Sequence, residues 1–372
     1  MRLHRVHVFA ISLLFASVAA PLAAMLAAQP PTKVKAAKKS AESDSTPNIK
    51  VAKPSPFFQS EMPVAITFTT NLKQLRKDKG ETSPWHAATV AMVDSAGKSV
   101  VVPVTAKTRG IWRLKNCEFP PVRWKFSKAN TKGTIFHELH EPKLVSYCRN
   151  SDAYEQYILQ EYMLYRVYRL LTPASHQARL MRVTYVDSAS GRVDATRYGF
   201  LLEDPAQVAA RLGGRIVKTK GAGPEDLDTE LQTLTFLFEY MIGNTDFSFA
   251  GLHNTELIQK SNGDLLPIVF DFDYSGAVDA SYATSDPHMR SVHVRDRQFR
   301  GYCSNKTEYS KAIDVFKEKK DAIYALYADD VGRLLQPRTV KATLSYFDEF
   351  YRDLATPKDF ERRVMSDCLA TH

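Results

Sequence analysis

The feature that most constrains the fold of this chain is a change in the spacing of its apolar residues. Between residues 64 and 126 apolar and polar residues alternate, as Val64, Ile66 and Phe68 do with the residues between them. Alternation with a period of two is typical of strands that bury one face. The ranges predicted as strands are 64–69, 88–93, 99–106, 122–126, 180–187 and 198–203.

Helical spacing replaces this alternation further along the chain. A helix is expected to begin at Ser151 or Asp152 and to end at Leu171, because Thr172 and Pro173 stop it. Further helices are expected over 229–242 and, three in number, within 303–372. Strands followed by helices indicate an α+β protein.

The N-terminus has the pattern of an export signal. Arg2 and Arg5 precede an apolar run and then small residues that reach Ala28. This order predicts a signal peptide over 1–28, cleaved after Ala24 or Ala28, and an exported, periplasmic or secreted protein. An uncleaved membrane anchor is the alternative.

The segment after the signal predicts a disordered basic linker over 29–56. It is rich in proline and lysine and has too little apolar surface to offset the entropy of ordering. The folded domain is expected over 57–372, with a strand-rich lobe over about 57–205 and a mainly helical lobe over about 206–372.

The positive charge of the chain is modest and spread out. Its 372 residues include 50 Lys and Arg against 41 Asp and Glu, a net charge of +9. Because these charges are not interleaved with a platform of side chains on which bases could stack, we expect no nucleic-acid binding. No other segment approaches the ~20 apolar residues of a membrane helix, so we expect no membrane span after signal cleavage.

The four cysteines predict disulfide bonds, since an exported chain meets oxidising conditions. Their spacing matches no zinc pattern, and three pairings are possible. The preferred pairing, Cys117–Cys148 with Cys303–Cys368, has the lowest sequence separation. Free structural thiols are the alternative.

Two acidic residues follow a predicted buried strand and indicate a cation site. Asp271 and Asp273 come directly after the second strand of a hairpin predicted over 254–259 and 265–270. Carboxylates within ~4 Å would repel by about 4 kcal/mol at an effective dielectric near 20, so a cation, an arginine or a shared proton must offset them.

The hairpin turn adds a third oxygen ligand. If Asn262-Gly263 is a two-residue turn, the register sets Asn254 opposite Asp271. Asparagine and aspartate oxygens suit Mg²⁺ or Mn²⁺. The alternative is that Asp273 and the other polar residues only cap turns.

Two further positions carry polar groups without an evident structural reason. The loop before Asn254 places Asp246 and His253 between an apolar helix and an apolar strand, and His253 is expected to have a structural role.

Glu161 falls within the apolar face of the predicted helix over 152–171. A buried carboxylate needs a partner, for which Lys125 and Arg109 are candidates, and an ordinary salt bridge is the alternative.

These motifs resemble the spore-coat protein H type of secreted atypical kinases. The resemblance runs from about Arg109 to Gly276 and rests on Arg109-Gly110 with the basic strand to Phe126, Leu170 to Pro173, Gly243 to Asp246 with His253-Asn254, and Val269 to Asp273. It implies a two-lobed atypical protein-kinase-like fold. The chain departs from ordinary kinases in having no glycine-rich phosphate loop and no histidine-arginine-aspartate triplet.

The resemblance also implies roles for individual residues. Asp246 would accept the proton of the substrate, and Asn254 and Asp271 would bind the metal, next to Asp273. Lys125 would contact the nucleotide phosphates and Glu161 would hold it, with Arg109 as a further phosphate ligand.

The sequence therefore predicts a metal-dependent phosphotransferase. It would use ATP with Mg²⁺ or Mn²⁺ and would phosphorylate a hydroxyl group of an unidentified protein or small molecule. Two alternatives stay open: an exported binding or assembly protein without catalysis that keeps the fold, and a metal-dependent phosphoesterase.

Overall fold

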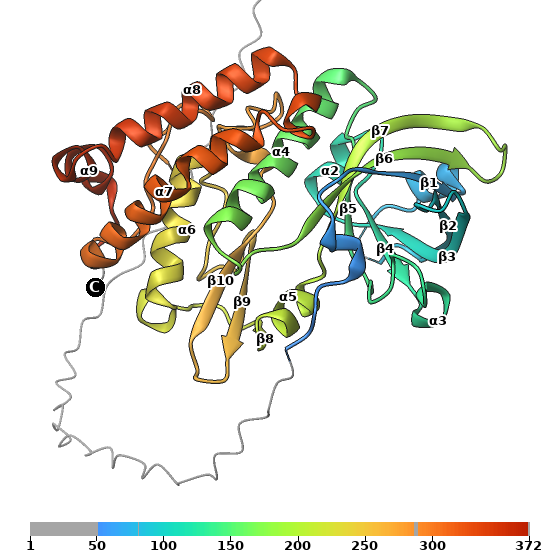
Figure 1. The fold of residues 1–372 in the computed structure, drawn as a ribbon, viewed down its shortest axis with the longest axis horizontal. Helices are drawn as coiled ribbons and strands as arrows, with labels where there is room; N and C mark the ends of the chain where they lie inside the picture. The colour runs from blue at the N-terminus through green and yellow to red at the C-terminus, as the bar shows by residue number, and fades with distance from the viewer. Residues whose placement is uncertain (1–50, 81, 286–288, 371–372) are drawn as a thin grey trace, which may run out of the picture. The chain divides into compact units, whose positions relative to one another are not determined.

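Seven strands of the protein close into one mixed β-barrel (Figure 1). The computed structural model describes residues 51–80, 82–285 and 289–370, so the predicted signal peptide and the linker up to residue 50 lie outside the described residues. The barrel strands are β1 (Val64–Thr70), β2 (His86–Val93), β3 (Ser99–Thr108), β4 (Val122–Phe126), β5 (Lys143–Val145), β6 (Ala178–Asp187) and β7 (Val193–Leu202).

The predicted two-lobed kinase-like fold is wrong. The strands follow the order β1-β2-β3-β4-β5-β7-β6, and β1 pairs with β6 in parallel from Val64↔Met181 to Thr70↔Asp187, which closes the barrel. Nine α-helices accompany this barrel in the described part of the chain. Apolar alternation predicts that a segment is a strand but not which strand it pairs with, so the closure was not predictable from it.

A second sheet and the long helices form the rest of the described structure. The three-stranded sheet has the order β10-β9-β8. Helix α4 packs against β6 and β7 of the barrel and against α6 and α7, so it belongs to both regions (Figure 1). These elements are α4 (Asp152–Leu171), α6 (Thr229–Ile242), α7 (Lys306–Leu326), α8 (Pro337–Asp353), α9 (Pro357–Arg363), β8 (Gly214–Val217), β9 (Thr255–Lys260) and β10 (Leu265–Val269).

Short helices fill the connections. The α-helices among them are α1 (Leu72–Lys77), α2 (Trp112–Asn116), α3 (Lys128–Thr131) and α5 (Pro205–Arg211). The 3₁₀ turns are η1 (Pro56–Gln59), η2 (Pro224–Asp226), η3 (Phe272–Tyr274), η4 (Gly332–Leu334) and η5 (Met365–Asp367). The sequence analysis did not predict these, nor β5 and β8, because segments this short carry little periodicity.

The predicted long elements are present, but the predicted hairpin register is wrong by one residue. Strand β4 and helices α4 and α6 have the predicted bounds, and three α-helices follow residue 303. In the hairpin Leu265 pairs with Gln259, which leaves a three-residue loop with Gly263 at φ +96°. In this register Asn254 faces Phe270, whose N–H donates to the Asn254 carbonyl oxygen at 3.1 Å.

Each region has its own apolar core. The barrel interior is filled by aromatic side chains such as Phe68 and Trp124, whose rings lie 5.1 Å apart. The second core joins α4, α6, α7 and α8 with the three-stranded sheet. Both predicted disulfides are present, Cys117–Cys148 in the barrel region and Cys303–Cys368 near the C-terminus.

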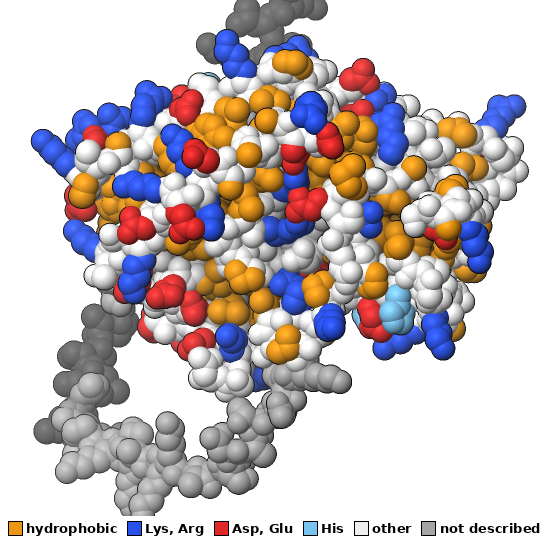
Figure 2. Space-filling view, in the orientation of Figure 1, with side chains coloured by type: hydrophobic (Ala, Val, Ile, Leu, Met, Phe, Trp, Pro, Cys, Tyr) orange, Lys and Arg blue, Asp and Glu red, His pale blue; other side chains and the backbone are white. Residues whose placement is uncertain are grey.

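The surface carries charges of both signs. On the face drawn in Figure 2, Lys and Arg side chains are interspersed with Asp and Glu and do not form a single patch. Within residues 51–370, apart from the gaps at 81 and 286–288, no helix is both apolar enough and long enough to cross a membrane.

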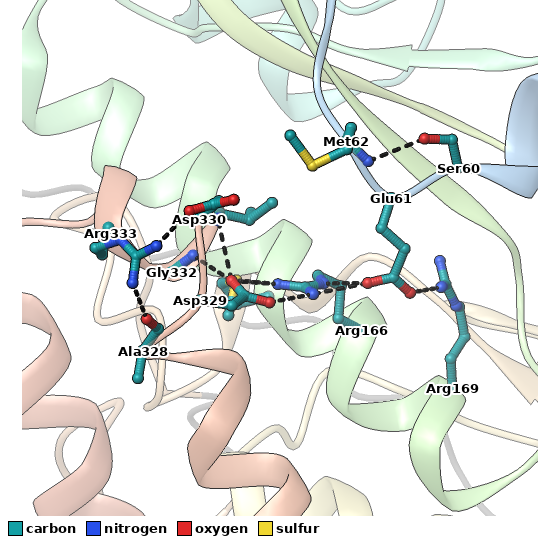
Figure 3. Close-up of polar contacts among 12 residues, drawn as sticks. Ser60, Glu61, Met62, Arg166, Arg169, Ala328, Asp329, Asp330, Gly332 and Arg333 are labelled. Carbon is teal, nitrogen blue, oxygen red and sulfur yellow. Dashed lines mark hydrogen bonds and ion pairs between the residues drawn. The ribbon is translucent and has the colours of Figure 1, made fainter.

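A buried arginine forms ion pairs that connect the segment before the barrel to the helices (Figure 3). The Arg166 side chain on α4 is 4% exposed and donates to Glu61, just before β1, at 2.7 Å. It also donates to Asp329, after α7, at 2.6 Å. Arg169 binds the other oxygen of Glu61. Through the two contacts of Arg166, three segments that are distant in sequence meet at its guanidinium group.

We predict that Arg166→Ala lowers the free energy of unfolding by about 2–3 kcal/mol, because Asp329 loses its arginine partner and Glu61 keeps only Arg169. Arg333→Ala is the matched control. It removes the Arg333–Asp330 pair, in which the side chains are 65% and 67% exposed. We expect that loss to stay below about 0.5 kcal/mol. Urea unfolding followed by fluorescence measures both, and equal losses would contradict the prediction.

Candidate active site

A cleft of about 530 Å³ lies where three distant segments of the chain meet. They are the turn after β3, the loop between α6 and β9, and the end of β10. The residues that line it are Arg109, Gly110, Ile111, Trp112, Arg113, Pro121, Asp246, Leu252, His253, Asn254, Phe270, Asp271, Asp273 and Tyr274. Those among them that the sequence analysis proposed for the site are Arg109, Asp246, Asn254, Asp271 and Asp273.

Asp246 is held in place by its own loop. Helix α6 ends at Gly243 in the left-handed conformation, and the Asn244 side-chain oxygen accepts the N–H of Asp246 at 3.0 Å. The His253 ring donates from Nε2 to Asp246 Oδ1 at 2.7 Å, and the Asn254 amide donates to Oδ2 at 3.0 Å. Burial raises the pKa of Asp246, while the contacts with His253 and Asn254 oppose that shift. The carboxylate is therefore fixed in direction.

Asn254 and Asp271 both adopt a left-handed backbone conformation. Their φ angles are +48° and +67°, which is uncommon for residues other than glycine. Residues held in such conformations cluster at functional sites, where the surrounding structure offsets the strain. Both side chains reach the same cleft although the strand register does not set them opposite each other. The predicted hairpin register placed Asn254 opposite Asp271, but the hairpin in the structure has a different register.

These two residues also present unused oxygen atoms. The Asn254 side-chain nitrogen donates hydrogen bonds to Asp246. The Asn254 side-chain oxygen accepts no hydrogen bond from the described residues. The Asp271 N–H donates to Tyr165 Oη at 2.9 Å, but its carboxylate accepts no hydrogen bond and forms no ion pair within the described structure. Two hard oxygen ligands fit Mg²⁺ or Mn²⁺.

Asp273 is more enclosed than Asp271. It is 5% exposed, and its Oδ2 accepts a hydrogen bond from Tyr282 Oη at 2.9 Å. Burial, and after it the charge of Asp271, raises the pKa of Asp273 to about 6. Because one oxygen is already bound to Tyr282, Asp273 is less suited to a metal than its neighbour.

Glu161 lies in α4 behind this cluster and is 1% exposed. Neither of its carboxyl oxygens has a hydrogen-bond partner among the described residues. Burial, and next the charges of Asp273 and Asp271, raises its pKa well above the usual value, although Arg113 and Arg109 act in the opposite direction. Burial thus favours the protonated form of Glu161, and the hydrogen-bonded or charged partner that the sequence predicted for it is not found among the described residues.

Two arginines supply the positive charge of the cleft. Arg113 donates to the Ser146 carbonyl oxygen. The charges that act on Arg113 include those of Asp273 and Glu161. Burial lowers the pKa of Arg109, against the attraction of Asp271. Both residues line the cleft, and each has a buried Nε without a hydrogen-bond partner in the described structure.

The lysine proposed from the sequence does not reach the cleft. Lys125 is 53% exposed and forms an ion pair with Glu141 at 2.9 Å. Lys143 on β5 is a second lysine close to the cleft, with its Nζ 4.0 Å from the centroid of the Phe270 ring, which lines the cleft. Burial, and then the charge of Arg109, lowers the pKa of Lys143 to about 8. The sequence analysis missed it because β5 has three residues and no visible pattern.

No protein-family model matches the chain, and no curated protein matches it. The resemblance to the spore-coat protein H type of kinases therefore stays a prediction, and the candidate function depends on the cleft alone.

The raised pKa of Asp273 predicts a stability change with pH. In the unfolded chain the group ionises near ~3.9, so between pH 4 and 6 the folded state holds a proton that the unfolded state has lost. Stability should therefore fall as the pH rises through this window. Asp273→Asn removes the ionisation and keeps an oxygen for Tyr282. We expect it to raise the free energy of unfolding by about 2 kcal/mol at pH 8 and by much less at pH 4.

Urea unfolding of both proteins at the two pH values measures this difference. An equal effect of Asp273→Asn at pH 4 and pH 8 would contradict the prediction, because it would show that the ionisation of Asp273 does not change the stability.

Proposed function

We propose that the protein is an exported, metal-dependent phosphotransferase that moves a phosphoryl group from a nucleotide to a hydroxyl acceptor. One observation carries the proposal: a fixed carboxylate, Asp246, shares a cleft with the unused oxygens of Asn254 and Asp271 and with two arginines. Phosphoryl transfer needs mainly positioning and charge neutralisation, and this combination of groups supplies both.

The cation would bind together with the nucleotide. Within the described residues no group of three or more His, Cys, Asp or Glu is arranged to hold a metal ion. Mg²⁺ commonly takes one or two protein oxygens and completes its shell with phosphate oxygens and water. Asn254 and Asp271 would be those protein ligands. When bound, the cation would neutralise charge on the nucleotide phosphates.

The remaining groups have separate tasks. Arg109 and Arg113, which line the cleft, would bind phosphate oxygens, and Lys143 would add a further positive charge. Asp246 would orient the acceptor hydroxyl and take its proton, while His253 holds the carboxylate in direction. The two disulfides support export into an oxidising compartment, which we propose to be the periplasm or the exterior.

We predict that Mg²⁺ with ATP raises the melting temperature of the wild-type protein, whereas Mg²⁺ alone does not, since the protein supplies only two oxygens. Asp271→Asn should lose this stabilisation. Asp264→Asn, in the exposed turn of the same hairpin, should keep it. Asp246→Asn should still bind the nucleotide but lose transfer to an acceptor by about 10²–10⁴-fold.

A thermal-shift titration and a radiolabel transfer assay measure these two effects. Binding that survives Asp271→Asn would contradict the ligand assignment. Nucleotide binding by the wild type without transfer to any acceptor would instead favour a binding or assembly protein.

We predict that Lys143→Met weakens nucleotide binding about 10- to 100-fold, because a buried cation near the phosphates is lost. Lys125→Met is the matched control and should change the dissociation constant less than about twofold, since that lysine is exposed and paired outside the cleft. Isothermal titration with Mg²⁺ and ATP measures both. The reverse order of effects would restore Lys125 as the phosphate ligand.

A further inference from the structure

A second, smaller cavity adjoins the cleft. It has a volume of about 200 Å³, and Asp246 and Tyr274 line both spaces. Its other walls come from the turn after α6, from Thr284 and Ser285, and from residues within 291–296. A compound in this cavity would therefore meet the Asp246 carboxylate from outside the nucleotide cleft.

The chemistry of this cavity differs from that of the cleft. The hydroxyl-bearing side chains that line it are Thr245, Tyr274, Thr284, Ser285 and Ser291. None of the described residues that line it is a lysine or an arginine, whereas Asp246 and Asp296 are acidic. Hydrogen bonds from the N–H groups of His293 and Val292 lower the pKa of Asp296, so it stays ionised. The cavity therefore offers hydrogen bonds to hydroxyl groups and repels anions.

Hydrogen bonds hold the walls of the cavity in place. Arg300 donates to the Thr245 carbonyl oxygen at 2.7 Å, and the Gly276 N–H donates to the Gly243 carbonyl oxygen at 3.1 Å. Ser285 Oγ donates to the Val292 carbonyl oxygen at 3.0 Å. Walls fixed in this way can select a ligand by shape, because little ordering entropy remains to be lost on binding.

We propose that this cavity is the acceptor subsite and that it takes a small, neutral polyhydroxyl compound, a sugar or polyol. The proposal rests on the phosphotransferase function and names its substrate class. The acceptor oxygen would form a bond to the γ-phosphorus as the bond from that phosphorus to the bridging oxygen breaks. The hydroxyl proton passes to Asp246, and a phosphate monoester and a nucleoside diphosphate leave.

Two probes that differ at C6, where one has a neutral hydroxymethyl group and the other a carboxylate, test the proposal: methyl β-glucoside and methyl β-glucuronide. With Mg²⁺ and ATP, the neutral glucoside should raise nucleotide turnover at least tenfold above the rate in water alone. The anionic glucuronide should raise it less than twofold. Equal stimulation by both, or stimulation only by a serine-containing peptide, would overturn the proposal, as would no stimulation by either glycoside.

A variant that fills the cavity separates this proposal from the function on which it rests. Ser291→Phe should reduce stimulation by the glucoside at least tenfold and leave the dissociation constant for ATP with Mg²⁺ within twofold of wild type. Ser95→Phe, in the exposed turn between β2 and β3, is the control and should change neither. Stimulation that survives Ser291→Phe would overturn the acceptor site. Calorimetry with ATP and Mg²⁺ before any acceptor is added tests nucleotide binding by itself, and its absence would overturn the phosphotransferase function and not only the acceptor site.

Discussion

The arrangement of the cleft depends on balancing opposite charges that are partly or wholly buried. Asp246, Asp271 and Asp273 approach one another there, with Glu161 buried behind them. Two responses are visible in the structure. Arginines and a lysine surround the acids, and the most buried carboxyl groups have raised pKa values, since an uncompensated buried charge would be too costly. The side chain of Asp271 has no hydrogen-bond or ion-pair partner among the described residues, which is why we assign the cation to it.

Both the barrel region and the helical region contribute charged residues to the cleft. Arg109 and Arg113 follow strand β3, the acids come from the end of β10 and the loop after α6, and α4 packs against both regions. Arg166 fixes α4 to the segment before β1 and to the turn after α7. A cleft built from separate segments is sensitive to their relative position, and so its geometry depends on contacts that lie outside it.

Much of the local structure could be predicted. The bounds of α4, α6 and β4, the three C-terminal helices and both disulfides follow from periodicity, caps and cysteine spacing. Candidate residues such as Asp246 and Asp271 were found because polar side chains at the ends of apolar helices and strands need a polar or charged partner. Lys143 was missed, and Lys125 was chosen in its place, because a three-residue strand gives no signal of which lysine is buried.

The sequence by itself determined which segments become helices and strands and which polar residues stand out among them, because local periodicity and turn chemistry act over a few residues. The tertiary structure alone decided that β1 closes a barrel with β6, which contradicts the expected two-lobed fold. It also decided that Asn254 and Asp271 share a cleft despite a register shifted by one residue. Strand partners, left-handed backbone and burial of a side chain depend on contacts between distant residues, and those contacts leave no pattern in a short stretch of sequence.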